Sequence, residues 1–252
     1  MEPILEVKNL TKTFQEEGRE AFAAVRGVSF ALYPNETLGI VGESGSGKST
    51  VVRMLTRLTD ATSGQILLNG QDITHLKGRA LREIYRSFQM VFQSPMTSFD
   101  PRRTLGDGIG ETLRNAGYSR GETEKRVCEL LAQCGLTADF ARKYPHEVSG
   151  GQCQRAAIAR ALAIQPELLI CDEATSALDV TVQKQIMELL TTLKKERGMS
   201  VLFICHDLAL VQSFCDRVLV MQNGEIVEEG SPDQIIQHPS HPYTRSLVEA
   251  VL

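Results

Sequence analysis

The sequence predicts an α/β protein that begins with β-strands and carries a helical insertion, and three stretches of the chain indicate this fold class. The first third alternates short extended segments with turn residues, as in LEVKNLTKTF. From about Gly106 to Leu162 the apolar residues recur at helical spacing instead. Beyond that stretch, the apolar runs ELLIC and SVLFIC have the length and composition of strands buried in a parallel sheet.

These stretches predict a single domain over residues 1–252. We expect its core to be formed by residues 1–95 and 163–252, with a helical subdomain inserted at about residues 96–162. Near the end of the chain, two extended segments flank Asn223-Gly224. This pair tolerates positive φ, which predicts a two-residue hairpin turn.

Composition argues against several classes of protein. Of the 252 residues 42% are hydrophobic, and the formal net charge of -4 argues against a broad nucleic-acid-binding surface. The N-terminus lacks the cationic start and apolar run of a signal peptide, and every apolar run is too short to cross a membrane, so we expect no membrane span. The six cysteines show no CxxC pair or other metal spacing, which predicts reduced thiols in a reducing cytosol.

The strongest motif is GESGSGKS at residues 42–49, which matches the phosphate-binding pattern GxxxxGKS. It follows the apolar run TLGIV and precedes a helical stretch, which is the context that the pattern requires. Its glycines let backbone N–H groups point at phosphate oxygens, Lys48 supplies a positive charge, and Ser49 is placed to ligate Mg²⁺. The alternative is a Gly/Ser-rich turn with an incidental lysine. With every fixed position filled, the motif predicts nucleotide binding.

Polar residues follow two of the predicted strands. Asp172 ends the strand LLICD and Glu173 comes next, so Asp172 is placed to hold Mg²⁺ and Glu173 to polarise the attacking water as a general base. His206 follows SVLFIC at the edge where open α/β sheets place their ligands. Gln93, in MVFQSP, is a weaker candidate because a surface glutamine is the default. The alternatives are a solvated turn for the acidic pair and a structural role for the histidine.

A second glycine-rich helix start lies in VSGGQCQRAAIARAL, where Ser149, Gly150 and Gly151 precede a long helical stretch. Such a helix N-terminus is an anion-binding site. It cannot easily share one phosphate group with the phosphate-binding loop at residues 42–49 (the P-loop) of the same subunit. A partner subunit would resolve this geometry. The alternative is a loop with a capping serine and two flexible glycines.

Together, GESGSGKS, VFQSP, VSGGQCQR, LLICDEATSALD and ICHD resemble the ordered motif set of ATP-binding cassette (ABC) transporter ATPases, and the resemblance covers nearly the whole chain. It implies a P-loop NTPase (RecA-like) core with an antiparallel β subdomain and an inserted α-helical subdomain. It also implies that Glu173 and His206 are catalytic and that residues 176–179, from Ser176 to Asp179, form the D-loop. The Mg²⁺ ligands that it implies are Ser49, Gln93 and Asp172. The ATP-binding residues that it implies are Phe14, Gly42, Glu43, Ser44, Gly45, Ser46, Gly47, Lys48, Ser49, Thr50, Gln93, Ser149, Gly150, Gly151, Gln152 and Asp179.

Three positions bear on how closely the chain follows the family. Phe14 falls where the family places an aromatic ring that stacks on adenine, although Phe14 could equally be a core residue of a strand and Phe22 lies near. The resemblance makes residues 148–152 the signature motif of the family, and Val148 begins it where leucine is usual. Cys153 stands where arginine is common. Neither departure removes a phosphate contact.

The resemblance also implies an assembly. It implies a head-to-tail dimer in which the P-loop of one subunit and the SGGQ segment of the other enclose each ATP with its Mg²⁺. The implied partners are two transmembrane permease subunits, a second ABC ATPase subunit and, indirectly, an extracytoplasmic solute-binding protein, with no nucleic acid. The implied location is the cytoplasmic face of the inner membrane, as a peripheral protein.

A finer resemblance concerns the solute. FQSPMTSFDPRRTLGDGI and the tail HPSHPYTRSLVEAV are similar to the ATPases of oligopeptide, dipeptide and nickel importers, which favours a heterodimer with a related chain over a homodimer. The chain shows no cysteine-rich extension, so no iron–sulfur cluster is expected, and His238 and His241 are interpreted as ordinary exposed residues.

Two other classes of function stay open at this point. One is a soluble cassette ATPase that acts on nucleic acid or ribosomes, for which the chain lacks a second cassette, a long coiled coil and a basic stripe. The other is a P-loop kinase for a small molecule, which would leave VSGGQ and His206 unexplained.

Overall fold

The computed structural model describes residues 2–15, 21–174 and 178–250, which fold into two compact units. The first unit is formed by Met1–Tyr85 together with Gly198–Leu252, and the second is formed by Arg86–Arg197. The first unit therefore joins the two ends of the chain, while the second is a continuous segment between them.

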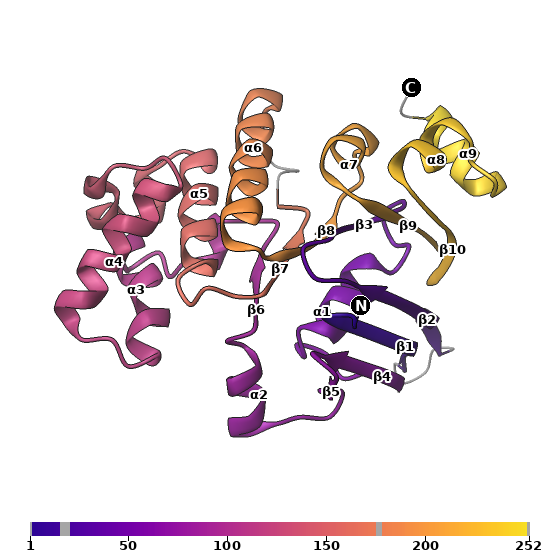
Figure 1. Ribbon diagram of the computed structural model, residues 1–252, viewed down its shortest axis with the longest axis horizontal. Helices are drawn as coiled ribbons and strands as arrows, with labels where there is room; N and C mark the ends of the chain where they lie inside the picture. Colours follow the sequence, from indigo (N-terminus) through magenta and orange to yellow (C-terminus); the bar gives the residue numbers. More distant parts are fainter. Residues whose placement is uncertain (1, 16–20, 175–177, 251–252) are drawn as a thin grey trace. The chain divides into compact units, whose positions relative to one another are not determined.

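A parallel sheet forms one part of the first unit (Figure 1). Its strand β3 (Thr37–Val41) pairs in parallel with β8 (Ser200–Ile204) on one side and with β9 (Arg217–Gln222) on the other. Every residue of β3 and of β8 is buried, which explains why both strands are continuous apolar runs in the sequence. Strand β10 (Glu225–Gly230) then pairs with β9 in an antiparallel manner.

The turn between β9 and β10 confirms the predicted hairpin. Gln222 and Glu225 are register partners, so Asn223 and Gly224 alone form the turn. Their φ angles of 50° and 84° are both positive, as a type I′ turn requires.

An antiparallel sheet forms the other part of the first unit. Its strand order is β2-β1-β4-β5, and β1 pairs with β2 and with β4. The strands of this sheet are β1 (Leu5–Phe14), β2 (Phe22–Leu32), β4 (Ser63–Leu68) and β5 (Gln71–Asp72). The extended segments predicted for the first third of the chain are thus confirmed.

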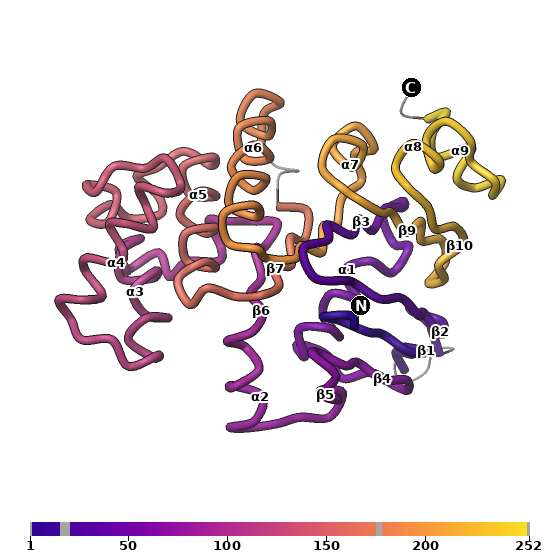
Figure 2. Tube along the Cα trace, viewed as in Figure 1, coloured from indigo at the N-terminus to yellow at the C-terminus, as the bar shows by residue number. Residues whose placement is uncertain are grey.

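Helices of the first unit follow the strands of both sheets. Helix α1 comes directly after the 42–47 loop, and its apolar side chains Val51, Val52, Met54 and Leu55 are buried. The C-terminal helices α8 and α9 form a tail that folds back beside β9 and β10, as Figure 2 shows. The bounds of these helices are α1 (Lys48–Leu55), α2 (Gly78–Ile84), α7 (Leu208–Phe214), α8 (Pro232–Gln237) and α9 (Pro242–Glu249).

The second unit is mainly helical and contains one pair of parallel strands. Strand β6 (Phe88–Val91) pairs with β7 (Leu168–Asp172), and helix α5 packs against β6, α3 and α4. The predicted helical stretch is confirmed, and α4 starts with a capping box between Ser119 and Glu122. The helical segments are η1 (Met96–Ser98), α3 (Leu105–Asn115), α4 (Arg120–Gln133), η2 (Ala138–Arg142), η3 (Pro145–Glu147), α5 (Gly150–Ala161) and α6 (Val180–Arg197).

All six cysteines lie within the described ranges and none of them forms a disulfide; Cys128 is half exposed and the other five are buried. Burial raises the pKa of Cys134 and of Cys171 to about 12 and the pKa of Cys153 to about 11. These thiols stay protonated at neutral pH and pack as small apolar side chains, as their positions in apolar runs indicate.

None of the helices within the described ranges combines the length and the hydropathy that crossing a bilayer requires.

Candidate functional site

The 42–47 loop leaves the parallel sheet at the carboxyl end of β3. Val41, the last residue of β3, is the register partner of Val220, and Ile40 is the partner of Ile204. His206, which follows β8 by two residues, therefore emerges at the same sheet edge as Gly42. The register of the first unit thus brings His206, predicted to be catalytic, to the same sheet edge as the P-loop.

Two glycines of the loop leave no room for a side chain. Gly42 has φ of 149°, and a Cβ atom built there would lie 2.2 Å from the carbonyl oxygen of Met221. Gly47 has φ of 107°, and its Cβ would lie 2.6 Å from the carbonyl oxygen of Ala24. Because the backbone itself fills these positions, the loop curls tightly and its N–H groups can approach a ligand closely. This shape fits a phosphate chain.

Lys48 is buried at the start of α1 and its ammonium group points back into the loop. Its Nζ donates hydrogen bonds to the carbonyl oxygens of Gly42 at 2.7 Å and Glu43 at 2.8 Å, and to Ser46 Oγ at 3.3 Å. A phosphate oxygen carries more negative charge than any of these neutral acceptors and can replace them. Ser49 is exposed in the first turn of α1, and Thr50 next to it is half buried.

Phe14 lies at the end of β1 with 43% of its surface exposed, so it is not the core residue that the alternative interpretation required. Its register partner Phe22 is 61% exposed, and the ammonium group of Lys12 lies 5.0 Å from the centre of the Phe14 ring. The first unit thus offers aromatic faces on which a flat ring can stack.

In the second unit, the register of two parallel strands brings Gln93 and Glu173 together. Val91 at the end of β6 is the partner of Cys171 in β7, so the residues two positions further along each strand emerge side by side. The amide Nε2 of Gln93 donates a hydrogen bond to Glu173 Oε2 at 2.7 Å. Two residues that are 80 positions apart in the sequence are therefore partners at one sheet edge.

Glu173 has an unusual backbone conformation. Its φ of 47° lies in the left-handed region, which a non-glycine residue adopts only with strain. Asp172 precedes it as the last residue of β7 and is half buried. Strained backbone of this kind clusters at functional sites, which marks Glu173 as a candidate functional residue.

The SGGQ segment forms the start of α5. Ser149 is the N-cap: its Oγ accepts from the N–H of Gln152 at 3.3 Å, and Gln152 Oε1 accepts from the N–H of Ser149 at 3.0 Å. Gly150 is exposed, whereas a Cβ on Gly151 would lie 2.5 Å from a methyl group of Val182 in α6. The capping serine of the alternative interpretation is therefore present, and Gly151 is required for helix packing.

The predicted D-loop begins at Ser176, which lies outside the described residues. Asp179, at its end, is exposed, and its Oδ1 accepts a hydrogen bond from the N–H of Val182 at 3.0 Å. It thereby caps the start of α6.

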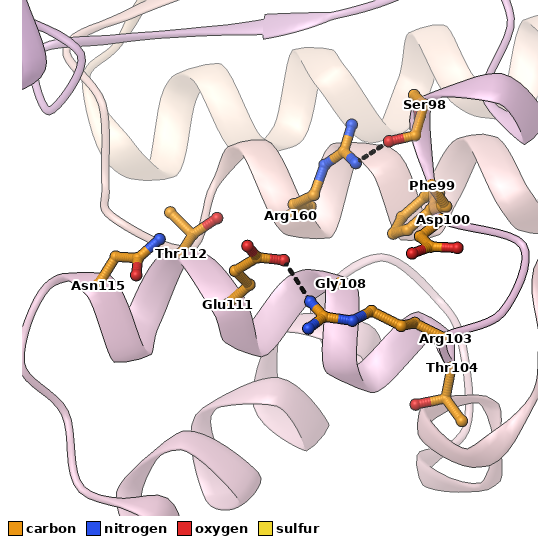
Figure 3. A pocket seen from close by; sticks show the side chains of 10 residues that line it. All are labelled: Ser98, Phe99, Asp100, Arg103, Thr104, Gly108, Glu111, Thr112, Asn115 and Arg160. Atoms are coloured by element: carbon orange, nitrogen blue, oxygen red, sulfur yellow. Dashed lines mark hydrogen bonds and ion pairs between the residues drawn. The ribbon is translucent and has the colours of Figure 1, made fainter.

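Sequence reasoning did not identify a cavity of about 320 Å³ in the second unit (Figure 3). The guanidinium group of Arg160 in α5 borders this cavity, lies 4.4 Å from the centre of the Phe99 ring and donates to the carbonyl oxygen of Ser98. Burial lowers the pKa of Arg160. On the other wall, Arg103 pairs with Glu111 at 2.9 Å. The cavity is lined by Ser98, Phe99, Asp100, Arg103, Thr104, Gly108, Glu111, Thr112, Asn115 and Arg160.

The histidines of the tail differ from the sequence interpretation in one respect. His241 is half buried, and its Nδ1 accepts a hydrogen bond from the N–H of Tyr243 at 3.2 Å, so His241 caps α9 rather than lying free on the surface. Within the described part of the chain, no three His, Cys, Asp or Glu side chains gather closely enough to hold a metal ion.

Comparison with known proteins identifies the class to which this fold and these motifs belong. Residues 25–176 match the family described as ABC transporter. The chain therefore belongs to the ABC transporter family and is one of its ATPases. Among curated relatives, the oligopeptide transport ATP-binding protein OppF of Salmonella typhimurium is 45% identical over 98% of this chain and 77% of its own length. The glutathione import ATP-binding protein GsiA of Pectobacterium atrosepticum is 48% identical over 99% of this chain, which spans 41% of that protein.

Solved structures confirm the predicted fold class. The dimeric, post-hydrolysis structure of the ATP-binding cassette MJ0796, bound to ADP and Pi, has a TM-score of 0.83 and 33% identity, with 90% of this chain and 98% of that chain covered. CbiO1 of Clostridium perfringens, part of the CbiONQ transporter complex, has a TM-score of 0.83 and 28% identity, with 94% and 92% covered.

Proposed function

We propose that this chain is the ATP-hydrolysing subunit of an ABC importer and that it drives the uptake of short peptides or related solutes through separate membrane subunits. OppF and GsiA serve oligopeptides and glutathione, which is itself a short peptide, and their similarity to this chain supports that solute class over a nickel chelate. The observation that supports ATP hydrolysis, and not ATP binding alone, is the hydrogen bond between Gln93 and Glu173 at 2.7 Å.

The residues of the P-loop have the chemistry to bind the phosphates of the substrate ATP. Lys48 would give up its hydrogen bonds to the loop carbonyls and donate to phosphate oxygens of ATP instead. The N–H groups of the loop would donate to the same phosphates. Phe14, as an exposed ring, would stack on the adenine. Ser149, Gly150, Gly151 and Gln152 would contact the ATP of a partner subunit, and Asp179 would support that contact.

The chain also has the donors that Mg²⁺ prefers in phosphate sites. Mg²⁺ is usually held by one or two carboxylates, a hydroxyl and the phosphates of the substrate, so a cluster of three acidic side chains is not needed. Ser49, Gln93 and Asp172 would be its ligands, and the ion would neutralise charge on the phosphates. Glu173 would then accept a proton from the attacking water, and His206 would contact the terminal phosphate.

The assembly that we propose contains two ATPase subunits and two permeases at the cytoplasmic face of the membrane, with a solute-binding protein on the other side. Two related ATPase chains are preferred over two identical ones. We further propose that the chain is one nucleotide-binding domain with its core at 1–95 and 163–252 and a helical subdomain at about 96–162. The compact second unit extends beyond that subdomain because β6 and α6 pack against α5 and β7 pairs with β6.

The general-base role is tested by Glu173→Gln in the complex purified from membranes. This variant should lose roughly 10²- to 10⁴-fold in ATP hydrolysis because the amide cannot accept a proton, while ATP binding stays intact. Glu167→Gln is the matched control, since Glu167 is exposed at the opposite end of β7. Full hydrolysis in the Glu173→Gln complex would refute the role.

Recovery of the chain with ribosomes or DNA, and without membrane proteins, would refute transport.

A further inference from the structure

A tyrosine of the C-terminal tail reaches the P-loop. The tail, residues 231–250, holds the HPYTRSL sequence that the catalytic motifs leave unexplained. The backbone N–H of Glu43, the second residue of the P-loop, donates a hydrogen bond to the hydroxyl oxygen of Tyr243 at 2.9 Å. The two residues are 200 positions apart in the sequence. The tail is therefore part of the environment of the phosphate-binding loop.

The same peptide group also contacts Lys48. The N–H of Glu43 and the carbonyl of Gly42 belong to one peptide unit, and that carbonyl oxygen accepts from Lys48 Nζ at 2.7 Å. A continuous chain of hydrogen bonds thus runs from Lys48 through the Gly42–Glu43 peptide to Tyr243. Donation from the N–H to Tyr243 polarises the peptide and strengthens the carbonyl as an acceptor for Lys48.

Hydrogen bonds hold the start of α9, the helix that positions the Tyr243 hydroxyl. The carboxylate of Glu228 in β10 accepts hydrogen bonds from the N–H of Ser240 at 2.7 Å and of His241 at 3.0 Å, which fixes the start of α9. His241 then caps α9 through the N–H of Tyr243 itself. Burial raises the pKa of Tyr243, so its hydroxyl stays neutral at physiological pH.

A comparable hydrogen bond from another segment anchors the loop at its other end. The carbonyl oxygen of Ser46 accepts from the N–H of Gly224 in the β9–β10 turn at 2.9 Å. Between these two anchors, Glu43, Ser44 and Gly45 are exposed. The Tyr243 bond therefore fixes the first half of the loop, and the Gly224 bond fixes the second half.

We propose that Tyr243 is a positioning residue that holds the P-loop in the shape that binds ATP. This inference rests on the proposed function, because it takes the P-loop as the ATP site. Without the hydroxyl, the Glu43 N–H turns to water and the loop must be ordered when the nucleotide binds, which weakens affinity. The chemical step does not involve this hydroxyl, so the effect falls on KM and not on kcat.

The test compares Tyr243→Phe with Ser246→Ala in the full chain. Phenylalanine keeps the ring and removes only the hydroxyl. Ser246 lies on the same helix, and its Oγ donates to the carbonyl oxygen of Pro242 within that helix at 3.3 Å, so it controls for the loss of a hydroxyl from α9. Tyr243→Phe should weaken ATP binding by roughly two- to tenfold, the range of one ordinary hydrogen bond, while Tm falls by about 4 °C at most. Binding is measured by calorimetry, and KM and kcat are measured in the assembled complex.

A second measurement does not depend on nucleotide. Amide hydrogen exchange of Glu43 in the ATP-free chain should accelerate in Tyr243→Phe and stay unchanged in Ser246→Ala. If the Glu43 amide exchanges at the same rate in both variants, or if both bind ATP as the unaltered chain does, the positioning role is wrong and the proposed function stands. If the unaltered chain binds no ATP, both are wrong.

Discussion

The glycines of the P-loop differ, residue by residue, in what their surroundings would tolerate. Gly42 and Gly45 both have positive φ, at 149° and 83°, so both would strain an L-residue. A Cβ on Gly42 would also lie 2.2 Å from the carbonyl oxygen of Met221, whereas a Cβ on Gly45 would meet no atom within 4 Å. The pair separates the effect of backbone strain from the effect of a steric clash.

We therefore predict that Gly42→Ala destabilises the chain much more than Gly45→Ala. Gly45→Ala should lower the free energy of unfolding by about 1 kcal/mol through φ strain alone. Gly42→Ala adds a clash with backbone that cannot rotate away, which should cost about 2 kcal/mol more. Urea denaturation of both variants measures the difference. Equal midpoints would show that the β3–α1 turn has more freedom than its contacts indicate.

Helix caps decide how the SGGQ segment should be interpreted at the scale of one element. Ser119 and Ser149 each start a helix with a complete capping box, in α4 and α5 respectively. A cap alone stabilises the helix whose N–H groups it satisfies. A cap that also binds phosphate has a second role, which the free energy of unfolding does not report.

Ser119→Ala and Ser149→Ala should thus have the same effect on stability and different effects on hydrolysis. Each should lower the free energy of unfolding by about 1 kcal/mol, because each removes one N-cap acceptor. Only Ser149→Ala should lower the ATPase rate of the assembled complex, by roughly tenfold or more, the loss expected for a charge-assisted bond. Equal ATPase rates in the two variants would leave Ser149 with the cap as its only role.

The elements that were predictable from the sequence are those whose signals are local. The α4 helix follows from its periodicity and cap, and the hairpin follows from Asn223-Gly224. The identities of the site residues follow from motif spacing. The Gln93–Glu173 bond depends on the register of β6 with β7, and the Glu43–Tyr243 bond depends on where the tail docks. Such contacts join segments 80 and 200 residues apart, and no local pattern encodes them.

For the whole molecule, the two helix starts that we propose as phosphate contacts predict association of two subunits. Helix α1 begins at the P-loop of the first unit, and α5 begins at Ser149 of the second. A helix N-terminus is favourable for a phosphate that it can reach, and the proposed function has the SGGQ segment contact the ATP of a partner subunit. The similar MJ0796 cassette is known as a dimer. We expect ATP to hold two ATPase subunits together.

Mg-ATP should therefore convert the Glu173→Gln subunit, alone or mixed with a related ATPase subunit, from one chain to a complex of two chains. Glu173→Gln slows hydrolysis, so the complex persists long enough to sediment in an analytical ultracentrifuge. Adding Ser149→Ala should weaken the complex because the partner loses a phosphate contact, whereas adding Ser119→Ala should leave it intact, since that serine only caps α4. ADP should not support the complex. Sedimentation as single chains at saturating ATP, with or without the related subunit, would contradict the composite site.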